Sequence, residues 1–297
     1  MKFADIGQQL RAYRLESGMR AEEIAVRLGV SRAALYRYEK GEVIKLETIR
    51  RLAELIKVSP LSLLGVGIEY FSRPTAFAER LRNLEEQADH VLQVGGRLCY
   101  PVTTDAFDGA IGEVWSEAAQ TAPDRLAARA AIEQALQTLR ERRSIFQARR
   151  PNVIAVLTEG AIQRFLADGL VGSLPISRST RVHACEAAMA EVVNLANLME
   201  SSPMGLQIGL TQGQEPSASF RILRGRERAH VVSCPFPVDS LPWIASGVAS
   251  LTSADDAVAA HQRVAEAMWR DALKGSPAAQ RLKAMVAEAE HLVRSAA

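Results

Sequence analysis

The sequence predicts an all-α N-terminal domain of five short helices, followed by a larger α+β domain with a small sheet. Apolar residues within positions 1–66 recur at helical spacing, whereas short apolar runs typical of strands appear only after residue 96. With 297 residues, of which 48% are hydrophobic, the chain is long enough for two domains with full cores. We place these domains at 1–66 and 96–297, with residues 67–95 as a connecting helix.

A helical hairpin over residues 21–41, AEEIAVRLGVSRAALYRYEKG, is the best-defined part of the first domain. Its apolar residues fall on one face of each of two helices only if the chain turns sharply near Gly29. Glycine takes the left-handed backbone of such a turn without strain. Ser31 provides an N-cap for the second helix, and Gly41 suits its C-terminal end. The pattern predicts a helix-turn-helix.

Three further helices complete the predicted bundle. Residues 3–19 and 46–56 carry apolar residues at helical spacing, and a short helix begins at Pro60, a residue favoured at the first helical position. We expect Leu61 and Leu64 to close the core of the bundle. A five-helix unit of about 65 residues is of the size that can just fold alone.

The second helix of the hairpin leaves one face exposed, and this face carries residues suited to nucleic acid. Its members are Arg32, Ala33, Tyr36, Arg37 and Lys40. Such a helix fits the major groove of duplex DNA, with its N-terminal residues against base edges and its flanks against phosphates. The alternative interpretation is an ordinary solvated face of a two-helix hairpin.

Four motifs run without a gap from residue 5 to residue 64. They are I-G-x-x-L-R-x-x-R, G-x-x-x-E-E-I-A-x-x-L-G-V-S, L-Y-R-Y-E-x-G and I-x-x-L-A-x-x-I-x-V. With these motifs the segment resembles the Xre/Cro family of phage-repressor-like DNA-binding domains. The resemblance implies a regulator that binds double-stranded DNA through the second helix of the hairpin.

The resemblance also implies roles for individual residues. Arg14 and Glu39 match an ion pair that ties the first helix to the end of the recognition helix. At six further positions the resemblance implies a place at the DNA. Arg32, Ala33 and Arg37 would contact bases, Ser31 and Lys40 would contact phosphates, and Lys45 would lie near the DNA backbone. Where the family commonly has a glutamine, this chain has Ala21, so either Arg20 makes the phosphate contact or affinity depends more on the recognition helix. Arg32 or Arg37 would read guanine through two hydrogen bonds.

Basic charge is concentrated in the first domain. Residues 1–64 hold 12 Lys and Arg against 8 Asp and Glu, a net charge of +4, and the remainder has a net charge of −2. Because +4 is modest, we expect one domain to bind DNA weakly and two to be needed. Apolar residues of the connecting helix, from Phe77 to Val91, are spaced like a coiled-coil seam, which makes a homodimer through this helix a hypothesis. The alternative is that this helix packs on its own domain.

The remainder of the chain alternates predicted helices and strands. Strands are predicted at 97–102, 153–157, 206–210 and 248–252, with a hairpin formed by 217–223 and 229–233. Helices are predicted at 105–119, 123–149, 158–170, 178–199, 253–273 and from 277 onward. The basic run Arg140–Arg150 is interpreted as a solvated face or an interface rather than a second nucleic-acid surface.

The segment from Val156 through the hairpin resembles the sensor-like C-terminal domains attached to other bacterial Xre-type regulators. This resemblance implies regulation or oligomerisation through a small-molecule effector or a partner protein. Arg178, Arg181 and Arg221, with Arg224, are candidates for binding an acidic metabolite, because arginine pairs with carboxylates and phosphates. The alternative is that they are ordinary surface arginines.

Other function classes find little support in the sequence. No signal peptide and no membrane-spanning run is recognised, and three distant cysteines match no metal spacing, so we expect a cytoplasmic protein with neither metal nor cofactor. A phosphate loop with its lysine is missing. Only Lys274 and Lys283 follow residue 64, so we expect no self-cleaving activity and no enzyme. The sequence thus predicts a dimeric bacterial transcription regulator; the alternative is an antitoxin-like autoregulator that binds a protein partner.

Overall fold

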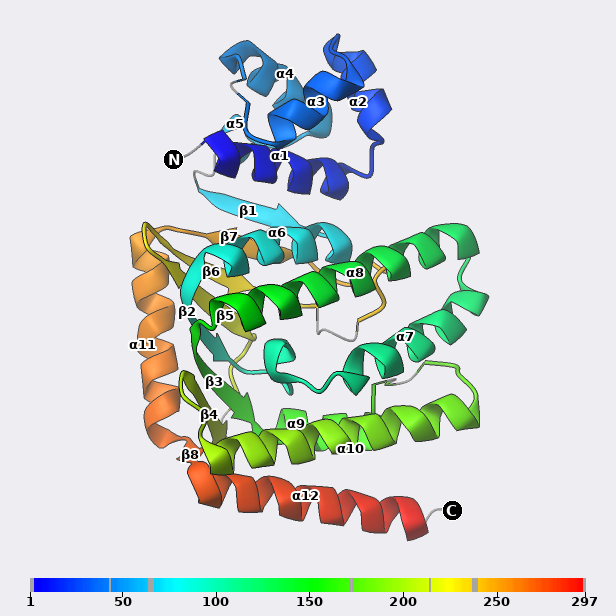
Figure 1. The fold of residues 1–297 in the computed structure, drawn as a ribbon, viewed down its shortest axis with the longest axis vertical. Coiled ribbons are helices and arrows are strands. Elements are labelled where there is room, and N and C mark those ends of the chain that lie inside the picture. The colour runs from blue at the N-terminus through cyan, green and yellow to red at the C-terminus, as the bar shows by residue number, and fades with distance from the viewer. Residues whose placement is uncertain are drawn as a thin grey trace.

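The computed structural model describes residues 3–42, 44–63, 67–170, 172, 174–213, 215–236 and 240–295. Five helices at the N-terminus form a small domain, here called the head, which lies at one end of a larger α+β body (Figure 1). The predicted fold class is confirmed. Within the described residues, however, the sheet has eight strands and is larger than predicted.

The head contains α1 (Phe3–Ser17), α2 (Ala21–Leu28), α3 (Arg32–Glu39), α4 (Leu46–Ile56) and α5 (Pro60–Leu63). Apolar side chains from all five helices pack into one core, in which Ile24, Leu35 and Leu63 are almost fully buried. Leu61, expected to close this core, is instead 57% exposed, and Leu63 closes it, because the turn of α5 directs position 63 inward. Leu64 lies outside the described residues.

The sheet has the strand order β1-β7-β6-β5-β2-β3-β4-β8. Its parallel part consists of β2 (Ala88–Val94), β3 (Asn152–Thr158) and β4 (Leu206–Thr211). Antiparallel strands complete it on both sides: β1 (Ile68–Phe71), β5 (Phe220–Gly225), β6 (Ala229–Ser233), β7 (Ala249–Thr252) and β8 (Leu273–Lys274). The predicted hairpin is confirmed as β5 and β6.

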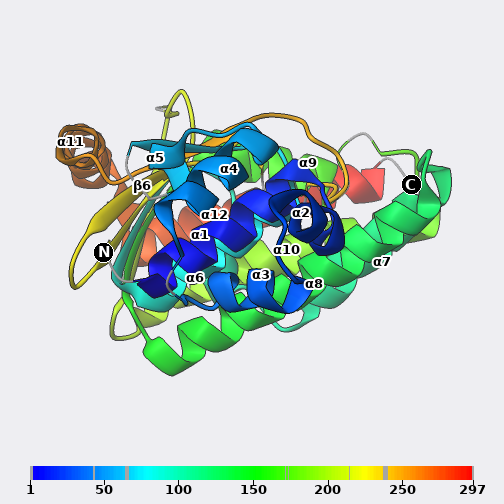
Figure 2. The ribbon, with the colours of Figure 1, turned by 90° about the horizontal axis from the view of Figure 1, so that it is seen from above.

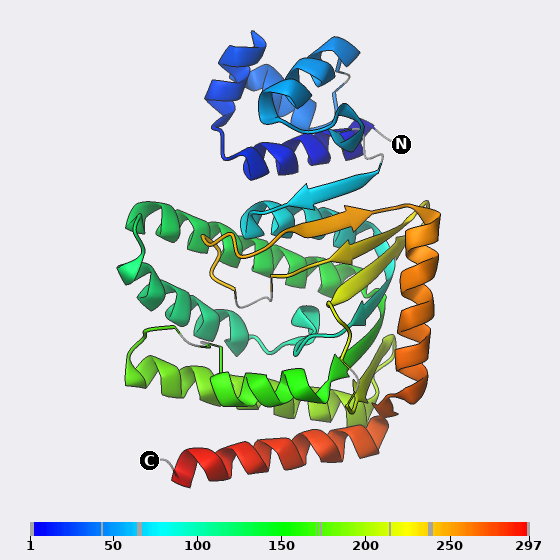
Figure 3. The same cartoon turned by 180° about the vertical axis from the view of Figure 1, so that it is seen from behind.

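Helices cover both faces of the sheet (Figures 1 and 3). On one face pack α6 (Pro74–Gln87), α7 (Ala106–Ala118), α8 (Arg125–Arg149), α9 (Glu159–Asp168), α10 (Arg178–Ser201) and α12 (Gly275–Ser295). The opposite face is covered by α11 (Asp255–Asp271). Because both faces are buried, β3 reads as a continuous apolar run: Val153 and Leu157 face the first group of helices and Val156 faces α11. Two short 3-10 helices, Tyr100–Val102 and Ala119–Thr121, lie beside α7.

The connecting helix predicted for residues 67–95 is wrong in its extent. This range holds β1, α6 and β2, and the helix ends at Gln87 rather than near Val94. Residues 88–94 form a central strand that is paired with β3 and β5. Hydrogen bonding to two distant strands overrides the local helical spacing here, since each pairing satisfies a full row of backbone groups.

The apolar seam of α6 is buried inside its own chain. Phe77, Leu81, Leu84 and Ala88 are each no more than 5% exposed and pack with β5, β6 and β7. The alternative that the sequence left open therefore holds, and the structure corrects the expectation of a dimerisation seam. The predicted strand at 97–102 is also wrong: its end forms a 3-10 helix, in which Tyr100 is buried beneath α8.

The head is docked on the body through α1, which packs against α6 and lies above it when the molecule is seen from above the head (Figure 2). The Tyr13 and Phe71 rings stack with their centroids 5.4 Å apart. Gln9 donates a hydrogen bond to Glu69, which also forms a buried ion pair with Arg80 at 2.9 Å. Aromatic stacking combined with a satisfied buried polar network favours one orientation of the head.

Candidate nucleic-acid interface

The turn between α2 and α3 sets the angle at which the recognition helix is presented. Gly29 has φ of +71°, and its N–H donates to Val26 O at 3.1 Å. Ser31 then caps α3, because its hydroxyl oxygen accepts a hydrogen bond from Ala34 N at 3.1 Å. Both features follow from local sequence, since a left-handed C-cap and a serine N-cap satisfy backbone groups that helix ends leave unpaired.

An ion pair joins α1 to the C-terminal end of α3. Arg14 Nε lies 2.5 Å from Glu39 Oε1, and Arg14 Nη2 lies 3.1 Å from Glu39 Oε2. Burial alone would lower the pKa of Arg14, but the hydrogen bond and charge of Glu39 outweigh it and raise that pKa. The carboxylate side chain is only 5% exposed, so this two-pronged pair is shielded from solvent. The pair fixes α3 relative to the helix that docks on the body.

Gly7 lets α1 and α3 approach closely. A Cβ atom at this position would lie 2.6 Å from the carbonyl oxygens of Tyr38 and Glu39 and 2.7 Å from Gly41 N. These are backbone atoms at the end of the recognition helix, so no side-chain rotation could relieve the overlap. The sequence alone indicated no role for this glycine, although it stands second in the I-G-x-x-L-R motif.

All eight DNA-contact residues expected from the sequence are solvent-exposed: Arg20, Ser31, Arg32, Ala33, Tyr36, Arg37, Lys40 and Lys45. Five of them, Arg32, Ala33, Tyr36, Arg37 and Lys40, share one face of α3 and its C-cap by helical spacing. The opposite side of α3 is closed by Leu35, which is 2% exposed. The exposed face of α3 thus presents cations, a phenol and a small residue.

Two arginines of this face are held by glutamates whose role the sequence alone did not indicate. Arg32 Nη1 lies 2.6 Å from Glu22 Oε1, and Arg32 also donates to the Tyr36 hydroxyl at 3.2 Å. The hydrogen bond with Tyr36 and the charge of Glu22 raise the pKa of Arg32. Arg37 Nε lies 3.4 Å from Glu42 Oε2. All these groups are exposed, so the pairs are weak and can be exchanged for contacts with DNA.

The candidate ligand-binding arginines lie on two elements, Arg178 and Arg181 on α10 and Arg221 and Arg224 on β5. Arg178 is exposed at the start of α10, and Arg181 donates to the carbonyl oxygens of Gly172 and Leu174. Arg224 bonds to Gln262. Arg221 borders a cavity of the body, which is described below, and Arg224 lines a different hollow beside the β5–β6 turn. Sequence alone could not separate them, because their surroundings depend on which strands and helices meet.

Two arginines of the basic run in α8 point into the body rather than to solvent. Arg142 forms a two-pronged ion pair with Glu85 at 2.6 and 2.7 Å, and Arg143 lies 3.2 Å from Asp108. The guanidinium carbons of both lie close to 5 Å from the centre of the Tyr100 ring. These two arginines therefore serve the fold and are not available to a nucleic acid.

Comparison with known proteins identifies the head alone. Residues 5–63 match a family model described as "Helix-turn-helix domain". Searches of curated proteins and of solved structures gave no significant match. Within the described part of the chain, no helix is both long and apolar enough to cross a lipid bilayer. The head is thus a helix-turn-helix domain, a module whose second helix binds DNA.

Proposed function

We propose that this protein is a cytoplasmic transcription regulator of the Xre type that binds its operator DNA as a homodimer. The observation that carries the proposal is the exposed side of α3, where Arg32 and Arg37 stand beside Lys40 on a helix fixed by Arg14 and Glu39. In this geometry the N-terminal half of α3 enters the major groove, and Arg32 or Arg37 forms two hydrogen bonds with a guanine.

The dimer is proposed from charge rather than from a visible interface. The head carries a net charge of +4 over residues 1–64, which supports only weak binding by one copy. Two copies would bind half-sites about one helical turn apart. Because each head is docked through α1 on its own body, the bodies of the two copies would set the spacing between the recognition helices.

We further propose that the body regulates the head and is not an enzyme. The two lysines beyond residue 64 are engaged: Lys283 pairs with Glu200 at 2.8 Å, and Lys274 donates to the carbonyl oxygen of Ala272 at 2.9 Å. The printed partners of both ammonium groups are thus carboxylate and carbonyl oxygens, whereas a self-cleaving repressor domain would require a lysine that activates a serine.

The test begins with selection of bound duplexes from a random pool, followed by affinity measurement at several salt concentrations. We expect Arg37→Ala to lose about 1 to 3 kcal/mol of discrimination at one base pair. Lys40→Ala should weaken binding to all sequences alike. It should also reduce the slope of log affinity against log salt concentration by about one. Arg178→Ala, on the exposed start of α10, is the matched control.

Two results would contradict the proposal. One is the absence of a salt-sensitive preference for any duplex over random DNA. The other is an Arg37→Ala variant that behaves like the Arg178→Ala control on every sequence. The dimer is tested separately by light scattering of the free protein and of its complex with the selected duplex, which should contain two chains and two half-sites.

A further inference from the structure

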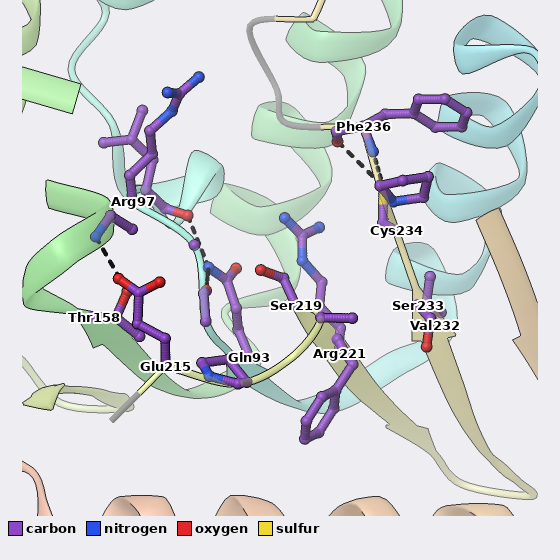
Figure 4. A pocket seen from close by; sticks show the side chains of 18 of the residues that line it. Gln93, Arg97, Thr158, Glu215, Ser219, Arg221, Val232, Ser233, Cys234 and Phe236 are labelled. Carbon is purple, nitrogen blue, oxygen red and sulfur yellow. Dashed lines mark hydrogen bonds between the residues drawn. The ribbon is translucent and has the colours of Figure 1, made fainter. Parts of the chain in front are cut away.

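A cavity of about 570 Å³ opens at the ends of central strands of the sheet (Figure 4). It lies where the parallel strands β2 and β3 end and where the antiparallel strand β5 begins. In open sheets, ligands bind outside the carboxyl ends of parallel strands, next to the place where the strand arrangement changes. The volume is in the range of pockets that hold small organic molecules.

Two consecutive glycines form part of the cavity wall. Gly95 and Gly96 follow β2 with φ of +79° and +86°. A Cβ atom on Gly95 would lie 2.7 Å from Pro216 Cγ and 2.9 Å from Ser219 Oγ, so the segment before β5 approaches the backbone directly. Only glycine combines this backbone conformation with so close an approach.

Positive charge dominates among the ionisable side chains around the cavity. Arg97, Arg164 and Arg221 line it, and the lining carboxylate is Glu215, which pairs with Arg164 at 3.0 Å. Thr158 lies at the cavity as the N-cap of α9, so the positive end of that helix is close by. A bound anion would therefore meet a favourable potential.

Arg221 is the best placed of these cations. Its side chain is 22% exposed, and its Nη1 lies 3.4 Å from Glu85 Oε1. The same carboxylate already holds Arg142 through two shorter hydrogen bonds. Two guanidinium groups therefore share one carboxylate, which leaves a local positive charge at the wall of the cavity.

Apolar side chains supply the rest of the surface. Val232 and Phe236 line the cavity from the side of α6, and Cys234 lies between them in the sequence. Burial raises the pKa of the Cys234 thiol, so it remains neutral. A ligand that only carried charge would leave this apolar wall in contact with water, and one with an apolar part would cover it.

We propose that this cavity binds a small organic anion, one in which a carboxylate, sulfonate or similar group meets Arg221 and an apolar part lies against Val232 and Phe236. The proposal rests on the regulatory role proposed for the body and names the class of molecule that would act there.

The position of the cavity connects it with the head. Phe236 lies with its ring centre 6.1 Å from that of Phe77, and the Phe77 ring is 6.3 Å from that of Phe71. Phe71 stacks on Tyr13 of α1, the residue next to Arg14. A ligand that displaced Phe236 would thus act on the surface on which α1 rests.

The experiment uses two fluorescent probes that differ by one charged group. Anilinonaphthalene sulfonate (ANS) is an anion with apolar rings, and N-phenylnaphthylamine is the same skeleton without the sulfonate. Both are titrated into the full chain and into Arg221→Gln, Arg221→Lys and Arg178→Gln. The variants are first compared with the parent by circular dichroism and thermal unfolding, so that a change in binding is separated from a loss of fold.

We expect one ANS molecule per chain, bound more tightly than the uncharged probe. Arg221→Gln should weaken ANS binding about tenfold or more and leave the uncharged probe unchanged, because a charge-assisted hydrogen bond is lost. Arg221→Lys should recover part of the affinity, and Arg178→Gln should match the parent. Absence of ANS binding, equal binding of both probes, or an unchanged Arg221→Gln variant would overturn the proposal. Because these titrations contain no DNA, such a failure leaves the proposed DNA binding to be decided by its own test.

Discussion

A methyl group added at Gly7 tests how the recognition helix is held. In Gly7→Ala the new carbon would lie 2.6 Å from two backbone oxygens at the end of α3 and 2.7 Å from Gly41 N. These distances are well below van der Waals contact, so α1 and α3 must move apart. Gly109→Ala is the matched control: Gly109 is also helical, in α7, and its Cβ would meet nothing within 4 Å.

The expected magnitude follows from two opposing effects. Replacing glycine by alanine within a helix stabilises by about 0.5 to 1 kcal/mol at either site. Overpacking against a fixed neighbour costs about 1 to 3 kcal/mol, and here the neighbour is backbone. We therefore expect Gly109→Ala to be neutral or stabilising and Gly7→Ala to destabilise the head by about 1 to 2 kcal/mol.

The assay can separate head from body because the three tryptophans, Trp115, Trp243 and Trp269, all follow residue 66. In urea unfolding, tryptophan fluorescence reports on the body, and amide hydrogen exchange in α1 and α3 reports on the head. Gly7→Ala should lower protection in the head, leave the fluorescence midpoint of the body nearly unchanged, and weaken DNA binding. If Gly7→Ala and Gly109→Ala showed equal protection and equal DNA affinity, the close approach of α1 and α3 would be refuted.

Three further outcomes are expected. Arg142→Ala should destabilise the body by about 3 kcal/mol in urea unfolding, because Glu85 loses its closest buried partner; a cost below about 1 kcal/mol would contradict that role. Glu22→Gln should raise DNA affinity about two- to fivefold, since Arg32 is released from an exposed pair and a negative charge leaves the interface; unchanged or weaker binding would count against the proposed interface. Burial raises the pKa of Glu191 above its ordinary value, so the folded state binds the carboxyl proton more tightly than the unfolded state does. The free energy of unfolding should therefore fall as the pH rises from about 4 through the raised pKa. The urea midpoint of the parent minus that of Glu191→Gln should therefore decrease between about pH 4 and pH 7. An increase in this difference over the same range would contradict the raised pKa of Glu191.

Much of the head could be predicted because its determinants are local. The turn at Gly29, the cap at Ser31 and the exposed arginines of α3 depend on residues within one or two helical turns of one another. The body was harder, because its sheet joins strands far apart in the chain: Ile68 pairs with Thr252, and β2 pairs with β5. A spacing that is helical in isolation cannot reveal that residues 88–94 have strand partners on both sides.

The sequence by itself determined the helix-turn-helix and the face it exposes, since periodicity and end caps act over a few residues. Only the tertiary structure decided the surroundings of the arginines, because burial and pairing depend on segments that meet after folding. It placed Arg142 inside the body and Arg221 at a cavity, and it brought Gly7 against the end of α3. It also set α1 on β1 and α6, so that the helix holding the recognition helix is the same one that contacts the body.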